Sequence, residues 1–136
     1  MSSQNQPMPK PKWMIVTGWI FTLIPLAVLV PSAIVNILKP PQIVEGRNHL
    51  GWKEEMFLGL GILQLACAVV YLIPRTSVLG AILITGYFGG AVATHVRVGD
   101  SLRELAPAIV LGVFVWLGLV LRDERLRALL PFRSIR

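Results

Sequence analysis

The residues best suited to chemistry lie near the end of one long uncharged segment. His95 occurs there in the sequence Thr94–His95–Val96–Arg97, and Tyr87 lies eight residues earlier. On a helix that spacing is roughly two turns, so the two side chains would lie on a similar face. Because an imidazole titrates near neutral pH, His95 is a candidate for acid–base work or for hydrogen bonding a quinone. The alternative is a structural role for His95 at a membrane interface.

Four other polar residues are candidates to contact a ligand. Arg97 is suited to an anionic head group or to an ion pair with Glu45 or Asp100, and equally to marking an interface. Glu45 and His49 are four residues apart, so they share a face if that stretch is helical. Gln64 lies midway along another uncharged run, where a cross-helix hydrogen bond and a ligand contact are the two alternatives.

Most familiar catalytic motifs are absent. The chain contains no phosphate loop and no GxGxxG, HExxH or CxxC sequence. Its single cysteine, Cys67, lies within an apolar run and is expected to be a small buried hydrophobe, which excludes a thiol–disulfide mechanism within one chain. His49 and His95 alone would not hold a metal well, so no metal site is expected.

The composition indicates an integral membrane protein. The chain has 136 residues, of which 54% are hydrophobic and 15% are charged, whereas about 25% are charged in a typical soluble domain. Disordered chains are polar, and disulfide scaffolds need several cysteines, so both classes are excluded. The net charge is +6. Because the basic residues lie at segment ends with no interleaved aromatics, we expect a lipid bilayer and not nucleic acid as the partner.

Four long uncharged runs could each cross a bilayer, since a helix needs roughly 20 apolar residues to do so. We therefore expect an all-α fold, an integral membrane four-helix antiparallel bundle over residues 13–121. A disordered cytoplasmic leader (1–12) precedes it, and a basic cytoplasmic tail (122–136) follows. Residues 121–131, which include the beginning of this tail, could form a short amphipathic helix. The expected spans are about 14–38, 54–74, 76–96 and 104–121.

The distribution of basic residues predicts the orientation. With four spans, eight Lys and Arg residues lie on the side of the termini and five lie on the other side. The positive-inside rule therefore puts both termini in the cytoplasm. On the opposite side, residues 39–55 form the longest link, and it is the only link large enough to cap a pocket.

The third uncharged run is rich in small residues that could pack closely against other helices. One face repeats every four residues, and a GxxxG pair lies beside it, so we expect this helix to be central. Dense packing without any ligand is sufficient to explain the pattern. The residues of the two faces are Ala81, Thr85, Gly89 and Ala93, then Gly86 and Gly90.

Three stretches resemble the DoxX-like family of small bacterial membrane proteins. They are Tyr71–Thr76, Leu79–Arg97 and Trp116–Asp123, and the resemblance extends over about residues 30–131. It implies four helices in the bacterial inner membrane. In the wider group it implies a link to quinone-dependent thiosulfate oxidation and to an oxidative-stress complex. The chain departs from that group at Ser32–Asn36 and at Gln64.

Three functions remain open. The first is an accessory or quinone-interacting subunit of a membrane redox system, with the quinone held without a covalent bond near His95, Tyr87 and Arg97 and with a redox partner protein. The second is a non-catalytic scaffold, or a protein that binds lipid or a small molecule, forming a homo-oligomer through the small-residue faces. The third is a cofactor-free enzyme acting on a lipophilic molecule, with His95 or Glu45 as proton donor.

Overall fold

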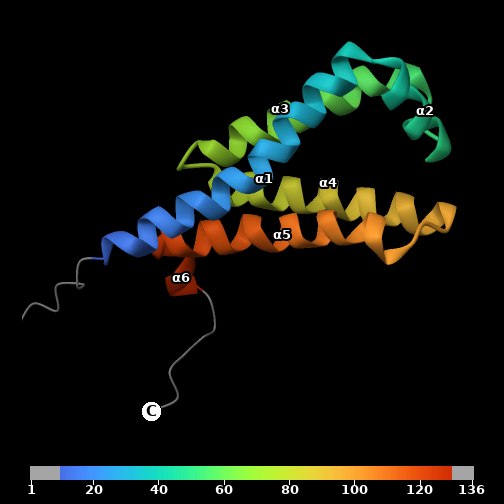
Figure 1. Cartoon of the computed structure of the whole chain (residues 1–136). Coiled ribbons are helices and arrows are strands. Elements are labelled where there is room, and N and C mark those ends of the chain that lie inside the picture. The colour runs from blue at the N-terminus through green and yellow to red at the C-terminus, as the bar shows by residue number, and fades with distance from the viewer. Residues whose placement is uncertain (1–9, 130–136) are drawn as a thin grey trace, which may run out of the picture.

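The computed structural model describes residues 10–129, and these residues form helices joined by short links (Figure 1). No strand occurs among them, so the expected all-α fold is confirmed. The elements are α1 (Lys12–Leu38), α2 (Pro41–His49), the 3₁₀ turn η1 (Glu54–Met56), α3 (Phe57–Leu72), α4 (Ser77–Val98), α5 (Leu102–Arg122) and α6 (Glu124–Leu129).

The four long helices pack in a ring. α1 packs against α3 and α5, and α4 packs against the same two helices. The beginning of α1, the α3–α4 turn and the end of α5 lie at one end of the bundle (Figure 1), while α2 and the α4–α5 link lie at the other. Consecutive long helices are therefore antiparallel, as expected. α4 has two main neighbours like each of the others, so it does not take the central position that its small residues suggested.

Four helices among the described residues are long and apolar enough to cross a membrane. Their outward faces carry large apolar side chains, such as Ile20, Val69 and Val113, each more than half exposed. Such a surface suits contact with lipid chains. α1, α4 and α5 extend up to two residues beyond the expected spans, so Arg97, Arg103 and Arg122 lie within helices, from which their long side chains can reach water. The second span is shorter than expected, because α3 ends at Leu72 and not at residue 74.

The segments outside the bundle are described only in part. Of the expected leader, residues 1–9 lie outside the described residues, and Lys12 already belongs to α1. Of the expected tail, residues 130–136 lie outside them as well. The short helix expected within residues 121–131 corresponds to α6, which buries Leu126 and exposes Glu124 and Arg125.

Glycines allow the closest helix contacts. A Cβ atom on Gly80 would lie 2.3 Å from the Cα atom of Tyr71 in α3. A Cβ atom on Gly61 would lie 2.8 Å from the carbonyl oxygen of Ala33 in α1, and one on Gly118 would lie 2.8 Å from the backbone nitrogen of Thr22. The contacts of α4 with α3, of α3 with α1 and of α5 with α1 therefore each depend on a missing side chain.

The small-residue faces of α4 are not the ones that hold the chain together. Only Ala81 of that set is buried, whereas the other positions are exposed. No atom lies within 4 Å of where a Cβ atom would sit on Gly86, Gly89 or Gly90. The exposed positions are Thr85, Gly86, Gly89, Gly90 and Ala93.

One end of the bundle is tied together by Tyr71 and Arg122. The Tyr71 hydroxyl donates a hydrogen bond to the carbonyl oxygen of Val115 over 2.8 Å. In return, Nη2 of Arg122 donates to the carbonyl oxygen of Tyr71 over 3.2 Å. The guanidinium carbon of Arg122 lies 4.8 Å from the centre of the Trp19 ring. These contacts join α1, α3 and α5.

The contact at Gly80 predicts a large effect of a single methyl group. Gly80→Ala should destabilise the protein by about 1–3 kcal/mol, because the added Cβ atom collides with the backbone of α3 and forces the hairpin apart. Thermal unfolding in detergent measures the change. Gly59→Ala is the matched control, since no atom lies within 4 Å of its added carbon. Equal unfolding temperatures for the two variants would contradict this packing.

Candidate functional site

Backbone geometry at the end of α4 brings Asp100 next to His95. Gly99 takes a left-handed conformation with φ of +79° and ends the helix. The chain then folds back, so that the N–H of Asp100 donates to the carbonyl oxygen of His95 over 3.0 Å. This is the usual hydrogen bond of a glycine-terminated helix. It holds the Asp100 side chain on the same side of the turn as the His95 ring.

Asp100 joins two imidazoles. Its Oδ2 atom lies 2.6 Å from Nδ1 of His95, and its Oδ1 atom lies 3.1 Å from Nε2 of His49 in α2. Hydrogen bonds from His95 and then from His49 hold the pKa of Asp100 below its ordinary value. Because the ionised carboxylate only accepts hydrogen bonds, Nδ1 of His95 carries a proton and donates it. The cluster ties α2 to the α4–α5 link.

A cavity of about 490 Å³ lies between α2, α3 and α4, and His95 is in its wall. Leu60, Leu63 and Leu83 are among its apolar lining residues. Since Nδ1 of His95 is engaged by Asp100, Nε2 is the nitrogen left for a ligand, and it makes no hydrogen bond within residues 10–129. The polar residues of the wall are Arg47, Tyr87, Thr94 and His95.

The cavity includes two of the six candidate ligand residues, His95 and Tyr87. Arg97 is exposed, and its Nη2 atom donates to the carbonyl oxygen of Leu50 over 2.5 Å, so it holds the chain that follows α2. It forms no ion pair with Glu45 or Asp100 among the described residues. Glu45 is exposed on α2 and does not line the cavity, and His49 contributes only through Asp100.

Gln64 lies outside the cavity, and its amide oxygen and amide nitrogen each form a hydrogen bond to another helix. Its Oε1 atom accepts a hydrogen bond from Nδ2 of Asn36 over 2.7 Å, and its Nε2 atom donates to Oγ of Ser32 over 3.0 Å. Both partners belong to α1. The amide therefore joins α3 to α1 in a buried position, which is the cross-helix alternative considered from the sequence.

Sequence reasoning missed several residues of this site. Arg47, Trp52, Cys67 and Thr94 line the cavity. Asp100 was considered only as a partner of Arg97. The signal for Asp100 was present, because a glycine that ends a helix brings the next residues back over its last turn.

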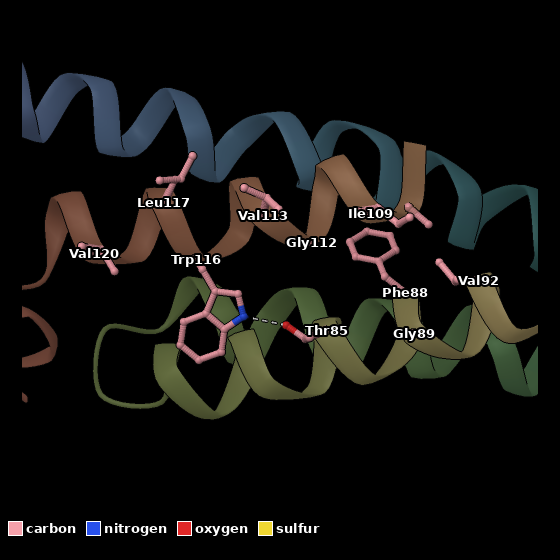
Figure 2. A pocket seen from close by; sticks show the side chains of 11 residues that line it. Thr85, Phe88, Gly89, Val92, Ile109, Gly112, Val113, Trp116, Leu117 and Val120 are labelled. Carbon is pink, nitrogen blue, oxygen red and sulfur yellow. Dashed lines mark hydrogen bonds between the residues drawn. The ribbon is translucent and has the colours of Figure 1, made fainter. Parts of the chain in front are cut away.

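A second cavity, of about 610 Å³, lies between α4 and α5 (Figure 2). Its wall is almost entirely apolar, with Phe88, Val92 and Val113 among the lining residues. Nε1 of Trp116 donates to Oγ1 of Thr85 over 2.8 Å, and that hydroxyl donates to the carbonyl oxygen of Ala81. Because these two polar groups are already engaged, the groove offers nothing to orient a polar ligand.

The described residues contain no group of three or more His, Cys, Asp and Glu side chains arranged to hold a metal ion. His49, His95 and Asp100 are close together, but the imidazoles bind different oxygens of the carboxylate. The three groups thus pair with one another and do not converge on one point.

Comparison with known proteins identifies a family. The sequence model of the DoxX-like family matches residues 20–118, a range that includes most of α1, all of α2, α3 and α4, and most of α5. Every residue of the cavity wall lies within this range. Searches of curated proteins and of solved structures gave no match.

The Asp100 cluster predicts a dependence of stability on pH. A carboxyl whose pKa is lowered on folding contributes stability above its ordinary pKa of 3.8, and that stability is lost as pH falls through the lower folded value. Thermal unfolding of the wild type and Asp100→Asn should therefore differ near neutral pH and converge below pH 3.8. A difference that stays constant with pH would show that the charge of Asp100 contributes nothing.

The Gln64 hydrogen bonds predict a loss of stability without a change in the cavity. Gln64→Leu leaves Nδ2 of Asn36 buried without its acceptor, so the free energy of unfolding should fall by about 1 kcal/mol. Gln42→Leu is the matched control, because Gln42 is exposed on α2. Chemical or thermal unfolding in detergent measures both variants. Equal effects would rule out a contribution of the α1–α3 hydrogen bonds.

Proposed function

The chain belongs to the DoxX-like family and is a multi-pass integral membrane protein, and we propose that it binds a quinone-type molecule in the cavity between α2, α3 and α4. The observation that carries the proposal is the position of His95. This imidazole is in the wall of a mainly apolar cavity, and Asp100 holds its other nitrogen. A carbonyl oxygen on a lipophilic ring is the kind of group that this arrangement suits.

The cavity suits such a molecule in size and polarity. Ligand pockets commonly measure about 300–1,000 Å³ and combine apolar walls with a few polar groups. Here the volume is about 490 Å³, and leucines from α3 and α4 line it. A quinone ring would lie against these leucines. Arg47 and Tyr87 add polar groups that favour a ligand oxygen over a purely hydrocarbon chain.

The His95–Asp100–His49 contacts suit proton exchange. When His95 is protonated, Nε2 can donate a hydrogen bond or a proton to a ligand oxygen, and Asp100 stabilises the positive charge. The His49 side chain is 64% exposed, so the cluster reaches water on the far side of Asp100 from His95. Reduction of a quinone to a quinol takes two electrons and two protons. In this proposal, a redox partner protein supplies the electrons.

The proposal includes an orientation. The ends of the chain would lie in the cytoplasm of a bacterium, because Lys12 at the beginning of α1, Arg75 between α3 and α4, and Arg122 at the end of α5 belong to the same end of the bundle. The cavity and α2 would then lie towards the outer face of the inner membrane. The chain would be an accessory, quinone-interacting subunit, and the exposed faces of α4 and α5 would be free for lipid or for another protein.

Two histidines provide a matched test of ligand binding. Titration with a short-chain ubiquinone analogue should quench the fluorescence of Trp52, which lines the cavity. His95→Gln should weaken binding by about tenfold, because one hydrogen bond worth about 1–1.5 kcal/mol is lost. His49→Gln should bind as the wild type does, since His49 touches Asp100 but not the cavity. In Trp52→Phe the quenching should disappear, which would show that the signal comes from Trp52.

The ligand control is an analogue of the same chain length without carbonyl groups. The proposal requires two results. This compound must bind the wild type more weakly than the quinone does, and its affinity must be the same for the wild type and for His95→Gln. Equal affinity of both compounds for the wild type would instead identify a general lipophilic site. If the quinone gave no saturable quenching, it would be excluded as a ligand.

A further inference from the structure

A third cavity, of about 450 Å³, lies at the opposite end of the bundle, between the beginning of α1, the α3–α4 turn and the end of α5. Its wall contains four basic side chains, Lys10, Arg75, Arg122 and Arg125, and one acidic side chain, Asp123. Such an excess of positive charge around one hollow favours an anionic ligand. The cavity shares no lining residue with the His95 cavity, so this inference does not rest on the proposed quinone site.

Most of this positive charge has no carboxylate partner. Lys10 forms an ion pair with Glu124, with Nζ and Oε1 3.4 Å apart. Within residues 10–129, Arg75, Arg122 and Arg125 form no ion pair. Oδ1 of Asp123 instead accepts a hydrogen bond from the backbone N–H of Arg125. No carboxylate among the described residues therefore neutralises the charge of these three guanidinium groups.

Arg122 is held in place before any ligand arrives. Its guanidinium group lies over the rings of Trp19 and Tyr71, 4.8 and 5.0 Å from their centres, and Nη2 is bonded to the Tyr71 carbonyl. Its Nε atom is buried and has no hydrogen-bond partner among the described residues. That N–H does not face the cavity, so Nη1, which makes no hydrogen bond within residues 10–129, is the donor left for a phosphate. A fixed guanidinium group binds phosphate at a smaller entropic cost than a mobile one.

The remaining wall adds a helix end and an apolar side. α4 begins at Ser77, in the wall, and no side chain caps its N-terminus. The positive end of the helix dipole therefore adds to the arginine charges. Ile15, Trp19 and Leu119 form the apolar side, and Ile15 and Trp19 continue as exposed residues along α1.

We propose that this cavity binds the phosphate group of an anionic phospholipid. The arginines and the N-terminus of α4 would hold the phosphate, and the acyl chains would lie along the exposed apolar face of α1. Free inorganic phosphate has the same anionic chemistry, but it would leave this apolar side without a contact. Basic side chains at a membrane surface each increase the affinity for acidic lipid by about fivefold.

The test measures lipid binding to the full chain in a neutral detergent by native mass spectrometry. The ligands are phosphatidylglycerol, phosphatidylcholine with the same acyl chains, and inorganic phosphate. Arg75→Gln/Arg125→Gln removes two charges from the cavity, and Lys53→Gln/Arg103→Gln removes two exposed charges from the other end. The expected result is about thirtyfold weaker binding of phosphatidylglycerol to the first variant, with affinity unchanged in the second.

Each other outcome overturns the proposal in a specific way. Equal weakening in both double variants would show general electrostatic attraction without a site. Equal binding of phosphatidylcholine and phosphatidylglycerol would exclude recognition of the anionic head group. Inorganic phosphate that binds as tightly as the lipid would identify a free anion as the ligand. If the first variant does not fold, Arg125→Gln alone must weaken phosphatidylglycerol binding, while Arg125→Lys must retain it.

Discussion

The structure depends on how closely its helices can approach one another. Large apolar side chains cover the outward faces, and in lipid these gain nothing by turning inward. Association therefore depends on van der Waals contact between backbones and on a few hydrogen bonds. Gly61, Gly80 and Gly118 allow that contact between successive pairs of helices in the ring. The hydrogen bonds of Gln64 and Tyr71 then fix the alignment of α3 against α1 and α5.

The same packing gives the two ends of the bundle different polar and charged groups. At one end, α2 and the Asp100 cluster lie beside a mainly apolar cavity, and its polar groups come from α2 and from the last turns of α4. At the other end, the short α3–α4 turn, the beginning of α1 and the end of α5 place basic side chains around the third cavity, which is more polar. Chemistry that needs a proton carrier beside an apolar cavity suits the first end, and recognition of an anion suits the second end.

Hydropathy was sufficient to predict the four helices and their alternating directions, because a helix in lipid must be long, apolar and internally hydrogen bonded. Helical spacing likewise placed His95 and Tyr87 in one cavity. The neighbours of each residue could not be predicted in this way. The small-residue faces of α4 were evident in the sequence, but periodicity does not say which face meets another helix, and the close contact of α4 with α3 is made at Gly80. Asp100 depends on the turn at Gly99, a feature of the backbone with no periodicity.

The segment that closes the His95 cavity is held differently from the rest of the chain. α2 buries none of its residues, and its contacts with the α4 end include the His49–Asp100 pair and the bond from Arg97 to Leu50. Breaking these two polar contacts would release α2 while leaving the contacts of the long helices intact. The rate at which a ligand enters or leaves from the aqueous side is therefore separable from the stability of the bundle. Substitutions at His49 and Arg97 would therefore change how fast a ligand enters and leaves, although neither residue itself lines the cavity.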